Sequence, residues 1–374
     1  MTRAITARAR VARSRPMRPG RRPRAALVAV AAGAALAAPA TVAHAETAAA
    51  PSAGVSTSGA AARPTAADRL AGRVAAGWLN RQFVDGERLQ TTFGGVPYDD
   101  AGLTLDAVIA FAAAKTNSVR AGRALAWLAE PAVLGGYLGT GSESYAGAHG
   151  KLAYTLSVSG RNPRSFGGRD VVTELVALQK PSGRLSDASM YGDYSNTFGQ
   201  SFGVLALQRA GAGAPARRAA AYLEGQACRD GGLPDAFEQS RCVSSTDATA
   251  IGMQALVAAG RWGAANRAAT WLSGQVRSGA LKNTNTAGLV AAALDTRPAI
   301  GANAADRART LIRSAQQGCG SRFAARGAIA YDGDGYDVDT APRATTQAIL
   351  GLAGANLATL TADGAMRHAP ALAC

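Results

Sequence analysis

The chain has 374 residues, of which 48% are hydrophobic and 17% charged, and its formal net charge at pH 7 is +15. The first 24 residues hold nine of the 40 Lys and Arg residues and none of the 25 acids, so the remainder carries 31 basic and 25 acidic residues and a net charge of +6. Because no cluster of Lys and Arg with interleaved aromatic residues follows, the composition excludes the usual pattern of a nucleic-acid-binding surface.

Residues 1–45 have the pattern of an export signal. An Arg-rich start is followed by an apolar run over residues 25–38 and by the small-residue sequence Ala43-His44-Ala45, which predicts cleavage after Ala45. The export route stays open, since the leader also holds an arginine pair. No later stretch reaches the ~18 consecutive apolar residues of a membrane span. We therefore expect a secreted, extracellular protein with no transmembrane segment once the signal is removed.

The rest of the chain divides by composition. Residues 46–68 are mostly Ala, Ser, Thr, Gly and Pro, which predicts a disordered linker because such a segment cannot bury a core. A single folded domain is expected over residues 69–357, followed by a C-terminal tail at residues 358–374.

The expected domain contains a repeat. A bulky residue, then an apolar residue and usually a Gln recur at spacings of 49, 48, 47, 49 and 41 residues, a regularity typical of repeat architectures. The anchors are Trp78, Trp127, Leu175, Tyr222, Trp271 and Ile312. Most anchors are followed by a Gly turn and then by a more apolar stretch, at residues 103–114, 151–158, 202–207, 251–259, 289–294 and 349–353.

Helical stretches that are apolar on most sides must be buried. We therefore expect twelve helices in six pairs, each with an amphipathic outer and an apolar inner member. Neither end of the array has the polar capping repeat that an open solenoid needs. The fold class predicted is all-α, with an α6/α6 toroid as the architecture.

The four cysteines are an even number in a chain expected to be exported, which favours disulfides. Three pairings are possible. We favour Cys228 with Cys242, because these close a short loop between two expected helices, and this leaves Cys319 for Cys374. A zinc site is the rival, but only His149 and His368 follow the leader and no Cys-x-x-Cys is present, so no metal and no cofactor are expected.

Residues 217–226, the sequence Asp230-Gly231-Gly232 and residues 246–250 resemble the prenyltransferase and squalene-cyclase repeat. The resemblance covers residues 69–357 and implies an α6/α6 toroid with a central cavity. The superfamily includes terpene cyclases, protein prenyltransferase β subunits, complement thioester domains and the cobalamin carriers intrinsic factor and transcobalamin. The chain is most similar to secreted actinobacterial members. One fold hosts many activities, so the resemblance does not imply a single function.

The catalytic motifs of that superfamily are incomplete here. Class II terpene cyclases protonate their substrate with the middle acid of Asp-x-Asp-Asp, and the nearest match is Asp337-Val338-Asp339-Thr340. Asp339 takes the acid position, but the third carboxylate is missing, and a loop with a helix cap is the alternative. The sequence starting at Cys319 departs from the Cys-Gly-Glu-Gln of the thioester domains, and no Gly-x-Ser-x-Gly of serine hydrolases is present.

Binding is the remaining interpretation. Aligning the inner stretches places several polar residues in one layer near the starts of the inner helices, with others bordering the same mouth of the ring. These candidate ligand-binding residues are Thr104, His149, Lys151, Asn196, Gln200, Thr249, Asn285 and Thr345. Two interpretations stay open: plain helix caps, or a polar ring in which side chains and helix N-termini hold a polar or anionic ligand group.

We therefore expect an exported, non-enzymatic binding protein. It would hold a small molecule, such as a cobalamin-like nutrient, or a partner protein at the mouth of the toroid, and could supply a membrane uptake component. The alternative is a diverged extracellular terpene cyclase or prenyltransferase-like enzyme that uses Asp339 as its general acid.

Overall fold

The computed structural model describes residues 63–374, and the expected export signal and most of the expected linker lie outside this range. Among the described residues, no helix is both long and apolar enough to cross a membrane. Helix α1 (Ala66–Asn80) begins inside the segment predicted as a linker, because Thr65 and Asp68 cap it reciprocally. The Thr65 side chain accepts the N–H of Asp68, and the Asp68 carboxylate accepts the N–H of Thr65.

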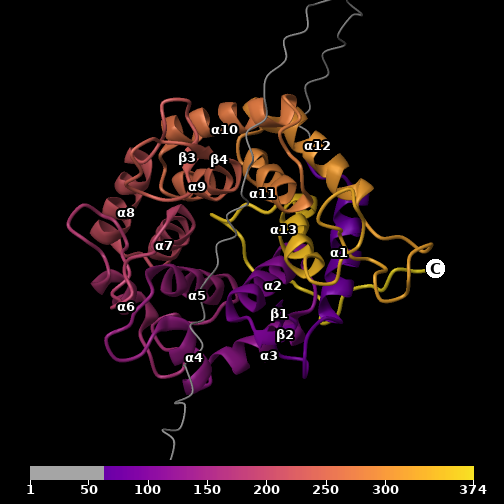
Figure 1. The fold of residues 1–374 in the computed structure, drawn as a ribbon, viewed down its shortest axis with the longest axis horizontal. Helices are drawn as coiled ribbons and strands as arrows, with labels where there is room; N and C mark the ends of the chain where they lie inside the picture. Colours follow the sequence, from indigo (N-terminus) through magenta and orange to yellow (C-terminus); the bar gives the residue numbers. More distant parts are fainter. Residues whose placement is uncertain (1–62) are drawn as a thin grey trace, which may run out of the picture. The chain divides into compact units, whose positions relative to one another are not determined.

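The fold is an all-α toroid of paired helices, as the repeat predicts (Figure 1). The inner ring consists of α2 (Ala101–Ala114), α5 (Ala146–Val158), α7 (Thr197–Arg209), α9 (Thr246–Ala258), α11 (Thr284–Asp295) and α13 (Ala341–Ala353). The outer layer consists of α1, α3 (Ser118–Leu128), α6 (Val171–Ala177), α8 (Gly213–Gly225), α10 (Trp262–Arg277) and α12 (Pro298–Ser314). Consecutive inner helices pack on one another, and α13 packs on α2 to close the ring.

Burial separates the two layers as expected from the sequence. Helix α2 buries residues on nearly every side, including Leu105, Val108 and Phe111, whereas α1 buries one face that includes Val74 and Trp78. The six apolar stretches predicted to be inner all fall in the inner helices to within one residue. The hydrophobic effect therefore explains which member of each pair lies inside.

The structure adds elements that the repeat does not predict. Helix α4 (Pro131–Leu138) follows α3, so the described part has thirteen helices and not twelve. Pro131 stands where most repeats have Gln, and at the first turn of a helix its missing N–H is not needed. Two short antiparallel pairs also occur, β1 (Gln90–Phe93) with β2 (Val96–Asp99) and β3 (Leu233–Pro234) with β4 (Ser244–Ser245).

Two of the repeat's Gln residues each connect one outer helix to the next. The Gln179 side chain donates to the Pro215 carbonyl in α8 at 2.9 Å, and the Gln316 side chain donates to the Ala71 carbonyl in α1 at the same distance. The second bond joins the sixth repeat to the first. The recurring Gln therefore also helps to close the ring.

Glycines bring some inner helices to backbone contact. A Cβ on Gly150 of α5 would lie 2.7 Å from the amide nitrogen of Gly203 in α7, and one on Gly288 of α11 would overlap the carbonyl oxygen of Gln347 in α13. Only a residue without a Cβ allows so close an approach. These contacts draw α5 to α7 and α11 to α13.

The segment after α13 returns across the middle of the ring (Figure 1). Leu357 is 1% exposed and lies between two inner helices, because its carbonyl accepts the Tyr154 hydroxyl of α5 at 2.8 Å and its N–H is donated to the Gln254 side chain of α9 at 2.8 Å. Leu360 is buried as well. The residues predicted as a tail are thus part of the packed domain, and they cross the axis toward the ends of the inner helices.

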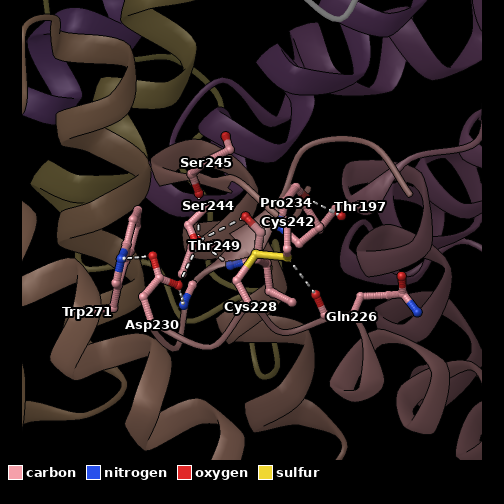
Figure 2. Close-up of a disulfide and its surroundings, with 12 residues drawn as sticks. Thr197, Gln226, Cys228, Asp230, Pro234, Cys242, Ser244, Ser245, Thr249 and Trp271 are labelled. Carbon is pink, nitrogen blue, oxygen red and sulfur yellow. Dashed lines mark hydrogen bonds between the residues drawn. A yellow bond between two sulfur atoms is a disulfide. The ribbon is translucent and has the colours of Figure 1, made fainter. Parts of the chain in front are cut away.

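Both disulfide pairings expected from the sequence are confirmed, Cys228 with Cys242 and Cys319 with Cys374. Figure 2 shows the first pair at the base of the loop between α8 and α9. In that loop the Asp230 carboxylate accepts hydrogen bonds from the Ser244 hydroxyl at 2.6 Å and the Trp271 indole at 3.0 Å. The second disulfide ties the end of the chain to the loop after α12.

We expect Gly288→Ala to destabilise the protein, because its methyl group would be forced into the α13 backbone. Overpacking of this kind costs about 1–3 kcal/mol. Gly122→Ala in α3 is the matched control, since a Cβ there meets no atom within 4 Å. It should stabilise by about 0.5–1 kcal/mol by favouring the helix. Urea unfolding of both variants measures this, and equal effects would contradict the proposed backbone contact.

Candidate functional site

Four of the predicted ligand residues hold the loops that lead into their own helices. In each case a fully buried side-chain oxygen accepts a loop backbone N–H at 2.8–3.0 Å. The pairs are Thr104 with Leu89, Gln200 with Leu185, Thr249 with Leu233, and Thr345 with Ile329. These contacts point outward, and the Gln200 amide also donates to the Ala219 carbonyl in the outer helix α8. They are the contacts of a structural anchor and do not support the ligand-binding prediction for these residues.

His149 and Asn196 also bond within the protein. The His149 ring lies 3.0 Å from the Glu174 carboxylate of the outer helix α6 and 2.8 Å from the Tyr145 carbonyl. Burial lowers the pKa of His149, which favours the neutral ring. The Asn196 side chain accepts the N–H of Gly199 and caps α7. Of the predicted residues, Lys151 and Asn285 remain.

The opposite side of the inner helices faces the axis of the ring. Residues two positions apart in an α-helix are turned by about 200°, so the residues two positions before or after each outward anchor point inward. Asn285 has the same orientation, because it lies two residues after Asn283, the N-cap of α11. Asp247 likewise lies two residues after Ser245, the N-cap of α9. The polar and aromatic residues placed this way are Asp106, Lys151, Phe198, Phe202, Asp247, Asn285, Arg343 and Gln347.

On one side of the axis the charges are paired. The Lys151 ammonium lies 2.7 Å from the Asp106 carboxylate and 5.8 Å from the centre of the Phe202 ring, so it connects α2, α5 and α7. The Arg343 guanidinium lies 3.3 Å from the carboxylate of Asp100, the N-cap of α2. Both axial cations therefore already have an anionic partner next to α2.

On the other side, three consecutive inner helices present acceptors that the protein does not satisfy. Asp247 Oδ1 in α9, Asn285 Oδ1 in α11 and Gln347 Oε1 in α13 are buried and have no hydrogen-bond partner among the described residues. Leaving a buried acceptor unpaired costs about 1–3 kcal/mol. A bound donor group would therefore remove this cost at each of the three oxygens.

Asp247 has the most unusual environment of the three. Burial raises its pKa, and the charge of Asp235 raises it further, while a hydrogen bond with the Thr286 side chain acts in the opposite direction. Burial also raises the pKa of Asp235. The pKa of the loop residue Tyr331 is raised by burial and also by the nearby charge of Asp247. Two carboxyl groups are thus held together in a partly desolvated place near the starts of α9 and α11.

Asp339, the acid expected for the enzyme alternative, lies exposed in the loop before α13. Its neighbour Asp337 accepts the backbone N–H and the hydroxyl of Thr340, both at 2.9 Å, which holds the chain at the start of the helix. This is the loop-and-cap arrangement that the sequence left open. The carboxyl groups that face the axis are Asp106, which is paired with Lys151, and Asp247.

No protein-family model matches the chain, and no curated protein does. Several solved structures resemble it, among them the following two. A protein from Actinoplanes has a TM-score of 0.57 at 15% identity, covering 77% of this chain and 99% of its own. A variant of the type II terpene cyclase MstE from Scytonema, with its product merosterolic acid A, has a TM-score of 0.50 at 14% identity, covering 77% and 97%.

The chain has a terpenoid-cyclase-like fold. At these identities the likeness concerns the fold alone, and it agrees with the superfamily implied by residues 217–226 and 246–250. A cobalamin-carrier relationship and an actinobacterial origin stay predictions.

The sequence interpretation missed Asp106, Asp247 and Gln347. A usable signal was present, because each is a charged or amide residue in an otherwise apolar inner helix, two positions from an aligned polar residue. The alignment gave the level of the polar layer along the axis but not the direction of its side chains.

We expect Thr249→Val to destabilise the protein by about 1–3 kcal/mol, because the buried N–H of Leu233 loses its acceptor. Thr310→Val on the exposed face of α12 is the control, and should change the free energy of unfolding by less than about 0.5 kcal/mol. Urea unfolding gives both values. If the two variants were equally stable, the anchoring role of the aligned threonines would be refuted.

A second prediction concerns pH. Because the folded-state pKa of Asp247 is raised, its contribution to stability is present below the unfolded pKa and is lost as pH rises through the folded pKa. Relative to Asp247→Asn, which does not titrate, the wild type should therefore lose stability as the pH rises above the ordinary pKa of an aspartate, about 4. Urea unfolding at increasing pH measures the difference, and a difference that stays constant or grows would contradict the raised pKa.

Proposed function

We propose that this protein is a secreted, non-enzymatic binding protein that holds a small molecule at the mouth where the inner helices begin. The observation that carries the proposal is the set of buried, unsatisfied acceptors on three consecutive inner helices. Binding sites in proteins combine such convergent polar groups with apolar and aromatic surroundings. Phe198 and Phe202 on α7 supply rings on the same inward side.

The geometry also favours access from one end. The segment that carries Leu357 crosses the axis deeper in the ring, where Tyr154 and Gln254 hold it. Asp247 stands two turns before Gln254 on α9, closer to the mouth. A ligand would enter from the loop side and stop before this segment. Delivery of a captured nutrient to a membrane uptake component would follow from such a one-sided site.

A second candidate function is acid catalysis, as in the type II terpene cyclase that shares the fold. The specific observation that favours it is the raised pKa of the axial Asp247, since a general acid must keep its proton near working pH. Against it, the segment Thr246-Asp247-Ala248-Thr249 holds one carboxyl group where the Asp-x-Asp-Asp motif of the type II cyclases holds three. We therefore rank binding first, and place the enzyme alternative on Asp247 in preference to Asp339.

Native mass spectrometry of the protein purified from its host tests the binding proposal. We expect a small molecule bound to the wild type and lost from the double variant Asn285→Ala, Gln347→Ala, because two acceptors are removed. The matched control is Asn303→Ala with Gln275→Ala on the outer helices α12 and α10, which should keep the ligand.

A wild type without ligand, or equal loading of both double variants, would count against binding at the mouth. The mass would also decide among a cobalamin-like nutrient, another small molecule and a partner protein. A cyclised product formed from polyprenyl substrates by the wild type, but not by Asp247→Asn, would support the enzyme candidate instead.

A further inference from the structure

One sector of the mouth concentrates negative charge and acceptor oxygens around an aromatic ring. The carbonyl of Asp235 accepts the N–H of Thr197 at 3.0 Å, which places Asp235 beside the start of α7, where Phe198 follows Thr197. Asp247 Oδ1 on α9 and Asn285 Oδ1 on α11 are both buried without a hydrogen-bond partner among the described residues, and these two helices pack on each other. Asp235, Asp247, Asn285 and Phe198, here called the amine sector, thus come from the α7, α9 and α11 region.

The protein supplies no counter-charge to the amine sector. Among residues 63–374, no ion pair involves Asp235 or Asp247. Lys151 is paired with Asp106, and Arg343 with Asp100, both next to α2.

Arg184, another cation near the amine sector, is also paired with carboxylates. Arg184 lies 3.0 Å from the Asp193 carboxylate and 2.6 Å from that of Glu238. A cationic ligand would therefore supply a charge that Lys151, Arg343 and Arg184 do not bring to the amine sector.

We propose that the amine sector binds a protonated primary amine, an inference that rests on the binding function proposed above. An alkylammonium group has one positive charge and three N–H donors. Asp247 Oδ1, Asn285 Oδ1 and the Asp235 carboxylate provide three acceptors from three separate elements. Hydrogen bonds between charged partners are shorter and stronger than neutral ones.

The chemistry selects an ammonium group over other cations. A guanidinium is a planar fork that suits a single bidentate carboxylate, whereas an ammonium is a compact charge whose donors point in three directions. The acceptors of the amine sector lie on three different elements, which fits the second shape. The Phe198 ring adds an aromatic face, against which a cation or its alkyl chain packs favourably.

The test uses the ¹⁵N-labelled protein purified from its host and three probes of similar size: n-butylammonium, the neutral butyramide and the anionic butyrate. The NMR signals of the Asn285 side-chain amide, assigned with Asn285→Ala, report on the amine sector. We expect n-butylammonium to shift these signals saturably and butyrate to leave them unchanged. Asp247→Asn and Asp235→Asn should each weaken n-butylammonium binding about tenfold or more.

Asp339→Asn is the matched control, because it makes the same change in charge on an exposed loop outside the amine sector. It should leave the affinity for n-butylammonium unchanged. The two aspartate variants of the amine sector check each other if one of them fails to fold. Affinity unaffected by either variant, or reduced equally by the control, would overturn the proposed ammonium site.

The outcomes separate this inference from the binding function. If butyramide shifts the Asn285 signals and n-butylammonium does not, the mouth binds ligands but the amine class is wrong. If no probe shifts them while native mass spectrometry shows a ligand lost from the Asn285→Ala, Gln347→Ala variant, the amine class is again wrong and the binding function stands. If neither experiment detects a ligand, both proposals fail.

Discussion

The contact between inner-helix backbones at glycine is the constraint on which the rest of this ring depends. At Gly150 against Gly203, and at Gly288 against Gln347, no Cβ can be accommodated. Helices packed this closely bring their inward side chains near one another. Polar residues that would be dispersed around a wide barrel are therefore concentrated, which is why Lys151 can reach Asp106 on one neighbouring helix and the Phe202 ring on another.

The two sides of each inner helix then carry different tasks. The outward side is structural, since a buried threonine or glutamine in four of the six inner helices fixes the N–H of the preceding loop. Unpaired buried backbone groups are costly, so these anchors hold the long loops in place. The inward side chains do not hold these loops. Their polar atoms either pair with a neighbouring inner helix, as Asp106 does, or stay unsatisfied, as Asn285 Oδ1 does.

This division gives the mouth an uneven electrostatic character. Next to α2, carboxylates and cations neutralise each other, whereas next to α9 and α11 burial raises the pKa of both Asp235 and Asp247, and the charge of Asp235 raises that of Asp247 further. An arrangement that stores unfavourable charge without a partner is typical of functional sites. The unpaired side is where binding of a cation would relieve both the desolvation and the repulsion.

The sequence by itself determined the fold class and favoured the Cys228–Cys242 disulfide among three possible pairings. The regular spacing of the apolar stretches indicates which helices are buried. Two cysteines 14 residues apart lie close together when the segment between them forms a loop. It also located the level of the polar layer along the ring. What it could not give is the rotation of each inner helix about its own axis, because an apolar helix buried on all sides has no hydrophobic face to orient it.

Only the tertiary structure decided that Thr249 faces its loop while Asp247 faces the axis, and that Leu357 returns between α5 and α9. Both depend on partners distant in the sequence. The loop that contains Leu233 must be in place before Thr249 has a donor to accept from, and the return of Leu357 depends on Tyr154 and Gln254, which lie 203 and 103 residues earlier. The periodicity of the repeat indicates which residues are buried. The directions of the side chains and the path of the Leu357 segment are set by hydrogen bonds to residues distant in the sequence.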